Sequence, residues 1–267
     1  MISFKKYIYL SGLFLLLSFC FSFTFFKPKK FIPPGTVSIT ENFFADEAEI
    51  SNAAWREFET ATKIKYGKFS KEHIAVLPDT LVWRQKNSSN EPYVQYYYRH
   101  PAYRDYPVVG ISYEQALAFC KWRTEKVKEF YIIRYKKDLK INYRLPSKEE
   151  WEKISLGGVD IMYGYARNSK GCILFNHRYA ADSVDAANTP NNPADVTAPI
   201  LSYQKNRFGI YNLFGNVAEM TAEKGICKGG GWRHLFEECR AGNDIPYTGT
   251  TAWLGFRCVC DFQGSSQ

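Results

Sequence analysis

The chain has 267 residues, enough for one large domain or two small ones with a sizeable core. Hydrophobic residues make up 45% and charged residues 23%, a composition that excludes a disordered or fibrous chain. The formal net charge is +8, but residues 1–30 contribute five lysines and no acid, so the other 30 basic and 27 acidic side chains leave only +3. This weak balance argues against a nucleic-acid partner.

An uncharged run, rich in Leu and Phe, extends from Tyr7 to Phe26 and is flanked by lysines on both sides. A helix of about 20 residues spans the roughly 30 Å core of a bilayer. We therefore expect residues 1–30 to be a cleaved export signal or a retained membrane anchor. Lipidation of Cys20 is a third interpretation, although the large Phe19 precedes it where lipoprotein processing favours a small residue.

Seven cysteines are spread along the chain without the paired spacing of a zinc site. Behind an export-type segment, such cysteines indicate disulfides in an oxidising compartment, and buried free thiols are the alternative. We accordingly expect an exported, membrane-associated protein.

The first half of the chain predicts two short strands, Val37–Thr40 and 43–50, and then a helix capped by Ser51 or Asn52 that runs to Phe58. Residues 60–106 have no sustained period and predict an irregular insertion.

A short buried strand is predicted at 107–111, and Ser112 is expected to cap the clearest helix of the chain. A further helix begins at Ser147, with Glu150 at the capping-box position. Residues 157–203 lack periodicity, and the rest predicts short strands and turns. The expected fold class is α+β, rich in loops and with few regular elements.

Six segments, in order, resemble the formylglycine-generating enzyme (sulfatase-modifying factor) superfamily. They are 43–58, 107–122, 144–151 (Arg-Leu-Pro-Ser-Lys-Glu-Glu-Trp), 206–220 (with Gly-Asn-Val-Ala-Glu), 228–232 (Lys-Gly-Gly-Gly-Trp) and 254–257 (Leu-Gly-Phe-Arg). The resemblance implies a C-type-lectin-like fold over residues 31–262, followed by a tail at 263–267. A carbohydrate-binding role would rest on this fold analogy alone.

Residues 90–94, 100–103 and 106–110 are similar to the gliding-motility and type IX secretion lipoproteins of the K and J type. This narrower resemblance implies a scaffold protein that assembles with protein partners in a cell envelope.

Active members of the superfamily use two cysteines between the last two motifs, as copper ligands or redox partners. The corresponding stretch here, residues 233–239 (the thiol interval), has His234 where the first reactive cysteine belongs and only Cys239 further on. The resemblance therefore implies no formylglycine synthesis and no copper. A remodelled oxidoreductase site around His234 and Cys239 is the alternative. Iron bound by histidines is not expected, because the four histidines lie far apart in sequence.

The turn at residues 212–219 matches a calcium motif of the superfamily. By resemblance, the amide of Asn212, the carbonyls of Gly215 and Val217, and the carboxylate of Glu219 would bind calcium, a cation that prefers oxygen ligands. The alternative is a Gly-Asn turn with a solvated glutamate. A second site would begin at residues 176–177, with Asp182, Asp185 and Asp195 as competing acids; it stays unassigned.

The resemblance also implies a disulfide between Cys120 and Cys258, worth about 5 kcal/mol by loop entropy. Pairings of Cys172, Cys227, Cys239 and Cys260 stay open.

Two further stretches have competing interpretations. The tyrosine-rich residues 93–100 predict either a partner surface or a loop with its rings turned inward. The basic residues 134–140 predict a solvated helix end or, alternatively, a contact with anionic lipid or protein.

Overall fold

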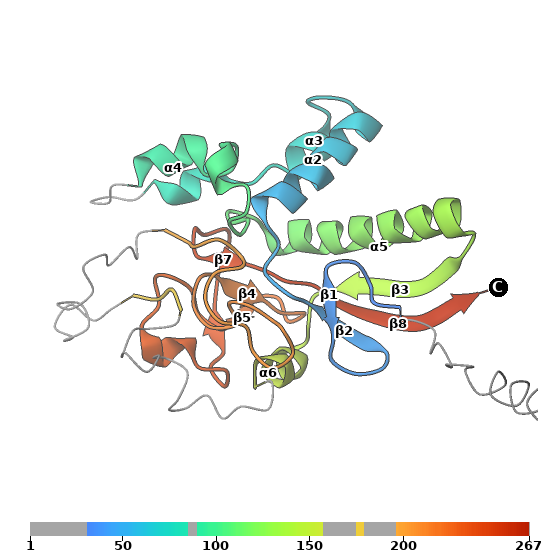
Figure 1. Cartoon of the computed structure of the whole chain (residues 1–267). Coiled ribbons are helices and arrows are strands. Elements are labelled where there is room, and N and C mark those ends of the chain that lie inside the picture. Colours follow the sequence, from blue (N-terminus) through green and yellow to red (C-terminus); the bar gives the residue numbers. More distant parts are fainter. Residues whose placement is uncertain (1–30, 85–89, 157–174, 179–195, 267) are drawn as a thin grey trace, which may run out of the picture. The chain divides into compact units, whose positions relative to one another are not determined.

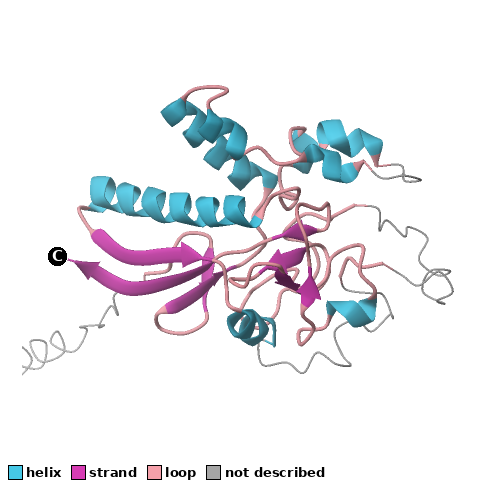
Figure 2. Ribbon diagram, turned by 180° about the vertical axis from the view of Figure 1, so that it is seen from behind, coloured by secondary structure: helices cyan, strands magenta, loops and turns pink. Residues whose placement is uncertain are grey.

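Two four-stranded sheets and five α-helices make up the part of the chain described by the computed structural model, which covers residues 31–84, 90–156, 175–178 and 196–266 (Figures 1 and 2). The predicted anchor at 1–30, with Cys20, lies outside these residues. No helix in the described ranges is long and apolar enough to span a bilayer. Residues Ile32–Gln267 form one compact unit.

The elements follow the chain in this order: β1 (Thr36–Ser38), β2 (Phe43–Asp46), α2 (Asn52–Tyr66), α3 (Lys71–Ala75), η1 (Thr80–Trp83), α4 (Glu91–Tyr96), η2 (Pro101–Tyr103), α5 (Tyr113–Tyr135), β3 (Asp138–Arg144), α6 (Lys148–Leu156), β4 (Ala218–Met220), β5 (Ile226–Lys228), η3 (Phe236–Cys239), β6 (Ile245–Pro246), β7 (Leu254–Gly255) and β8 (Val259–Ser266). Short elements joined by long loops confirm the predicted α+β, loop-rich class.

The first sheet is antiparallel in the order β1-β2-β8-β3. On β3 the residues alternate, so that Leu139, Ile141 and Tyr143 are buried while their neighbours are more exposed. The long helix α5 lies along β3 (Figure 1). The predicted tail at 263–267 is wrong up to residue 266, because β8 continues to Ser266 and pairs there with Asp138. Pairing with a distant strand gives this polar segment its structure.

Helix α5 starts as predicted, with a capping box. The Ser112 hydroxyl accepts from the Gln115 amide, and the Gln115 side chain accepts from the Ser112 amide. The helix buries Phe119 against Trp55 of α2, with stacked rings whose centroids are 5.5 Å apart. Ser51 is the cap of α2, which continues eight residues beyond the predicted end at Phe58.

The prediction of an irregular insertion at 60–106 is wrong for most of that stretch, which includes the end of α2 and four further helical segments. Their helices are short, and large aromatic rings rather than a repeating pattern hold them in place. Trp83 contacts Tyr97 at 4.5 Å between ring centroids and stacks on Trp232 at 5.9 Å. Tyr97 and Tyr98 are buried, so the inward-facing interpretation of the tyrosine-rich run holds for them, while Tyr96 is exposed.

The predicted strand at 107–111 is also not a strand. Its backbone makes single contacts instead: Ser51 and Pro107 form an isolated bridge, and the Val108 amide donates to the Ile50 carbonyl. The second sheet, β6-β5-β4-β7, is mixed, since β4 pairs with β7 in parallel and with β5 in antiparallel fashion. Its strand β4 carries Glu219 of the candidate site.

Candidate functional site

A buried ion pair lies between β4 and the segment after β7. Arg257 donates from Nη2 to Oε1 of Glu219 at 2.6 Å and from Nε to Oε2 at 2.7 Å, and both side chains are inaccessible to solvent. The indole Nε1 of Trp151, on α6, donates to the same carboxylate at 2.7 Å. Two further guanidinium N–H groups, one on Nη1 and one on Nη2, donate to the carbonyls of Asp46 and Tyr211. A buried charge is tolerated when it is paired and hydrogen-bonded, as both members of this pair are.

A second buried acid, Glu49, completes what we call the buried charge centre (Glu49, Glu219, Arg257 and Trp151). Asn216 Nδ2 donates to its Oε1 at 2.8 Å, and Asn212 Nδ2 donates to its Oε2 at 3.2 Å. Burial raises the pKa of Glu49 to about 8; the charge of Arg257 opposes this shift, and the charge of Glu219 adds to it. The centre thus holds two carboxyl groups against one arginine.

The predicted calcium turn lies against this centre. Asn212 has a positive φ of 50° and Gly215 a φ of 69°. A Cβ at Gly215 would lie 2.2 Å from the carbonyl oxygen of Asn176, so only glycine fits there. The Oδ1 atom of Asn212 is buried and has no hydrogen-bond donor among the described residues.

The four predicted calcium ligands differ in how available they are. The orphaned Oδ1 of Asn212 is a hard oxygen of the kind that calcium binds. Glu219, by contrast, already has both carboxylate oxygens occupied by Arg257 and Trp151. The alternative of a solvated glutamate is wrong, because Glu219 is fully buried. Within the described ranges, no three His, Cys, Asp or Glu side chains form a metal-binding group.

The residues of the unassigned second site are only partly described. Asn176 donates to the Val196 carbonyl at 3.0 Å, and His177 contacts the Arg178 carbonyl through Nδ1 at 2.8 Å. The His177 ring lies against Phe175 and Phe236. The competing acids Asp182, Asp185 and Asp195 lie outside the described residues.

The thiol interval contains a histidine and a thiol that are both enclosed. Nδ1 of His234 accepts from the Gly231 amide at 3.0 Å, its ring meets Trp253 edge to face at 4.7 Å, and burial lowers its pKa. Cys239 Sγ contacts the Leu235 carbonyl at 3.4 Å, and burial raises the pKa of this thiol to about 12. Such a thiol is protonated at neutral pH and is a poor nucleophile and metal ligand.

Two other cysteines meet in the core. The Sγ atoms of Cys120 on α5 and Cys258, which precedes β8, lie 3.5 Å apart, and both residues are buried thiols in this structure. The geometry brings together the two cysteines that the resemblance pairs; the bond itself stays a prediction. Cys172 lies outside the described residues.

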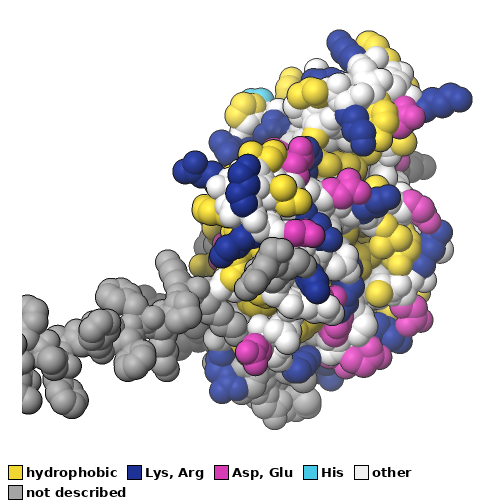
Figure 3. All heavy atoms as spheres, turned by 90° about the vertical axis from the view of Figure 1, so that its right-hand side faces the viewer, with side chains coloured by type: hydrophobic (Ala, Val, Ile, Leu, Met, Phe, Trp, Pro, Cys, Tyr) yellow, Lys and Arg dark blue, Asp and Glu magenta, His cyan; other side chains and the backbone are white. Residues whose placement is uncertain are grey.

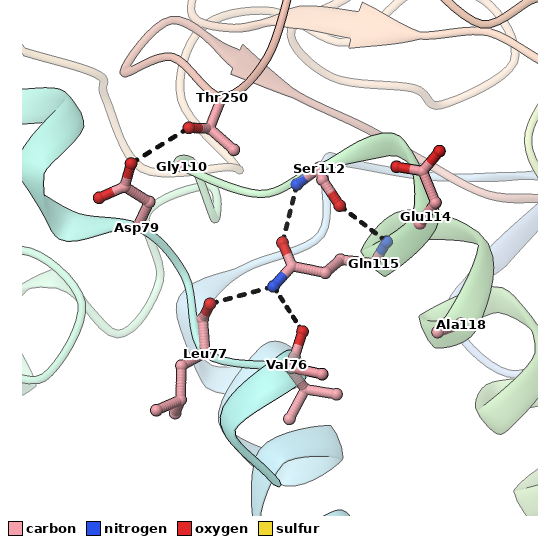
Figure 4. A pocket seen from close by; sticks show the side chains of 10 residues that line it. Val76, Leu77, Asp79, Gly110, Ser112, Glu114, Gln115, Ala118 and Thr250 are labelled. Carbon is pink, nitrogen blue, oxygen red and sulfur yellow. Dashed lines mark hydrogen bonds between the residues drawn. The ribbon is translucent and has the colours of Figure 1, made fainter. Parts of the chain in front are cut away.

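A hollow of about 460 Å³ opens beside the start of α5 and contains none of the predicted site residues (Figure 4). Gln115 crosses one wall and donates to the carbonyls of Ala75 and Leu77, while Asp79 and Thr250 contact each other at 3.2 Å. These hydrogen bonds are made between the polar groups themselves, and they connect α3, η1 and α5 around the hollow.

Comparison with known proteins identifies the family. The sequence profile of the family described as "Sulfatase-modifying factor enzyme 1-like domain" matches residues 15–262. The chain belongs to this family. Its fold class, an α+β sulfatase-modifying-factor fold with few regular elements, is the one predicted from the sequence.

Individual relatives are distant. Formylglycine-generating enzyme from Mus musculus is 25% identical over 210 residues, which cover 68% of this chain and 49% of that protein. A serine/threonine-protein kinase pkn1 from Chlamydia caviae is 24% identical over 246 residues, covering 82% of this chain and 33% of that protein. The chain therefore spans half or less of these relatives. Among solved structures, PvdO from Pseudomonas aeruginosa is 17% identical with a TM-score of 0.49, covering 82% of this chain and 80% of that one.

The local sequence pattern does not indicate a role for Glu49. Its segment, residues 43–58, resembles a family motif, but the resemblance assigns this side chain no function. Its position beside Asn212, Asn216 and Arg257 depends on contacts between segments more than 160 residues apart, which a local pattern does not reveal.

Proposed function

We propose that this chain is a non-catalytic member of the sulfatase-modifying-factor family that acts as a scaffold or interaction component of a cell envelope. One observation carries the proposal: the only sulfur between Gly231 and Gly255 belongs to Cys239, whose thiol is buried with a pKa of about 12. The mouse relative is named as a formylglycine-generating enzyme, so loss of that chemistry would leave the fold as the functional part.

The physical argument rests on the number and state of the sulfurs. The chemistry that the family resemblance implies needs two of them, either as soft ligands to copper or as redox partners. At pH 7 a thiol with a pKa near 12 is ionised only in about one molecule in 10⁵. The alternative of a remodelled site around His234 and Cys239 has the same weakness, since the histidine is enclosed and the thiol stays protonated.

Calcium is the ion that we propose for the turn at 212–219, with Asn212, Gly215, Val217 and Glu219 as its ligands. The orphaned Oδ1 of Asn212 supports this assignment. Glu219 would share its carboxylate between the cation and Arg257. When bound, calcium would supply positive charge beside Glu49 and Glu219, two acids that face a single arginine.

Membrane attachment through residues 7–26 and assembly with protein partners complete the proposal. The similarity of residues 90–110 to gliding-motility and type IX secretion lipoproteins supports such machinery as the setting. In this chain that stretch forms α4, η2 and the loop that packs over Trp83.

A peptide-oxidation assay tests the central point. The full chain is incubated with copper and a cysteine-containing peptide, and a catalytically active formylglycine-generating enzyme serves as the positive control. We expect no aldehyde product and no stoichiometric copper. Turnover above the rate of free copper would overturn the non-catalytic assignment.

Capture from envelope membranes tests the assembly. Tagged full-length protein is isolated with mild detergent and its mass is measured. We expect a complex larger than the single chain, and metal analysis should find calcium. A partnerless monomer in that experiment would contradict the scaffold role.

A further inference from the structure

The far end of α5 exposes an unusual combination of large apolar and basic side chains. Phe130, Ile132, Ile133 and Tyr135 are 53%, 46%, 66% and 53% exposed, respectively. We define the α5 tip as these residues together with four exposed cations: Phe130, Ile132, Ile133, Tyr135, Arg134, Lys136, Lys137 and Lys140. Large apolar groups gathered in one place on a surface indicate a contact with another body.

The tip is ordered. Phe130, Tyr131 and Tyr135 contact one another, with ring centroids 5.1 to 6.1 Å apart. Lys136 takes up a left-handed conformation that ends the helix, and its amide bonds back to the carbonyl of Ile132. The apolar groups therefore lie on the last turns of a capped helix.

The net charge of the tip and its surroundings is positive. Residues 130–140 contain four cations and one acid, Asp138, which gives a net charge of +3. The neighbouring end of β8, residues 262–266, carries no charged residue. Viewed from this end, the molecule shows Lys and Arg side chains among hydrophobic ones, with Asp and Glu side chains on the same face (Figure 3). Aromatic and aliphatic groups interleaved with lysines are typical of segments that lie at the surface of an anionic bilayer.

The short stretch of chain between the proposed anchor, residues 7–26, and Ile32 limits the distance from the anchor to the point where the chain enters the domain. The carbonyl of Pro34 accepts hydrogen bonds from Arg123 of α5 and Tyr143 of β3, so the chain enters the domain beside this helix. Ten residues of helix from Arg123 to Ile133 rise about 15 Å. Five residues, 27–31, lie between Phe26, the end of the uncharged run, and Ile32, and the six steps along the chain reach about 20 Å at most.

We propose that the α5 tip docks on the surface of an anionic lipid bilayer, in the same membrane that holds the N-terminal segment. This inference rests on the proposed membrane attachment and adds a second contact to it. The apolar side chains would enter the interface while the lysines meet lipid head groups. The domain would then be held in one orientation, with the opposite end of the fold facing away from the membrane.

Quenching by brominated lipid tests the proposal. The full chain is reconstituted into vesicles of brominated phosphatidylcholine and phosphatidylglycerol, and the fluorescence of wild-type protein is subtracted from that of Ile133→Trp. Leu81→Trp is the matched control, because Leu81 is 56% exposed on η1, away from the α5 tip. We expect quenching of the tryptophan at 133 to be about twofold or more greater than at 81, as for a side chain at the interface.

The charge requirement is tested by adding Lys136→Glu and Lys137→Glu to Ile133→Trp, which changes the net charge of residues 130–140 from +3 to −1. Loss of the extra quenching supports the proposal. Equal quenching at 81 and 133 in chains that sediment with the vesicles overturns this inference alone. Quenching that depends on protein concentration rather than on these lysines assigns the tip to a second copy, and chains that do not sediment with vesicles overturn the attachment as well.

Discussion

The buried charge centre and the thiol interval are neighbours in the fold, but their side chains differ in how they are bonded. In the charge centre, Glu219, Arg257 and Trp151 form a closed set of hydrogen bonds that joins β4, α6 and the segment before β8. Trp232, which directly precedes the thiol interval, donates from its amide to the carbonyl of Asn216, and the Asn216 side chain donates to Glu49 of the charge centre. The only sulfur of the thiol interval is enclosed and protonated.

The comparison separates the residues that stabilise the domain, in the charge centre, from the residues that catalysis would require, in the thiol interval. Removing Arg257 would leave two carboxyl groups buried beside each other, so the fold depends on it. No comparable charge depends on Cys239. Replacing Cys239 would therefore leave the hydrogen bonds of the charge centre intact.

The largest effect is expected at the ion pair. Arg257→Met should lower the free energy of unfolding by about 3–5 kcal/mol, because Glu219 is left buried without its partner. Urea unfolding of the purified chain measures this loss.

Arg84→Met is the control for that substitution. Arg84 pairs with Glu91 in a bidentate manner, but both side chains are about 60% exposed, so solvent screens the pair and its removal should lower the free energy of unfolding far less than removal of Arg257. Similar losses in the two variants would remove the distinction between the charge centre and the surface.

The next effect concerns thiols that would serve stability rather than chemistry. If Cys120 and Cys258 are joined, reducing that bond should cost about 2–4 kcal/mol, since the closed loop is long. Denaturant unfolding with and without reductant measures the difference. Non-reducing peptide mapping that finds both cysteines alkylated would show that the predicted bond is absent.

A glycine pair tests how tightly the calcium turn is packed. Gly215 and Gly249 have nearly the same φ, 69° and 67°, but an added Cβ meets the Asn176 carbonyl at 2.2 Å in the first case and nothing within 4 Å in the second. Gly249→Ala should cost about 1–2 kcal/mol from backbone strain alone. Gly215→Ala should cost about 1–3 kcal/mol more from the steric conflict. Equal melting temperatures of the two variants would indicate that the turn shifts to accommodate the added methyl group at residue 215.

The smallest signal is expected from Cys239 itself. With a pKa of about 12, this thiol should react with iodoacetamide at pH 8 about a thousandfold more slowly than an ordinary exposed cysteine. Mass spectrometry of native and urea-unfolded samples measures the labelling. Rapid modification of the native protein would revive the alternative of a reactive site in the thiol interval.

Part of this picture was predictable from local sequence. The caps at Ser112 and Ser147 are read from side chains three residues apart, and both form as expected: the Ser147 hydroxyl accepts from the Glu150 amide, and the Glu150 carboxylate accepts from the Ser147 amide. The helices of residues 60–106 cannot be predicted in this way because they are too short to produce a periodic pattern. Aromatic rings from distant segments stabilise them instead.

By itself, the sequence determined the family, the α+β class and the presence of a single sulfur in the thiol interval, because these depend on residue identity and on neighbours along the chain. Only the tertiary structure decided that Glu219 pairs with Arg257, that Glu49 joins them, and that residues 263–266 form a strand. Each of these depends on partners brought together from far along the chain, where burial changes what a charge or a backbone segment does.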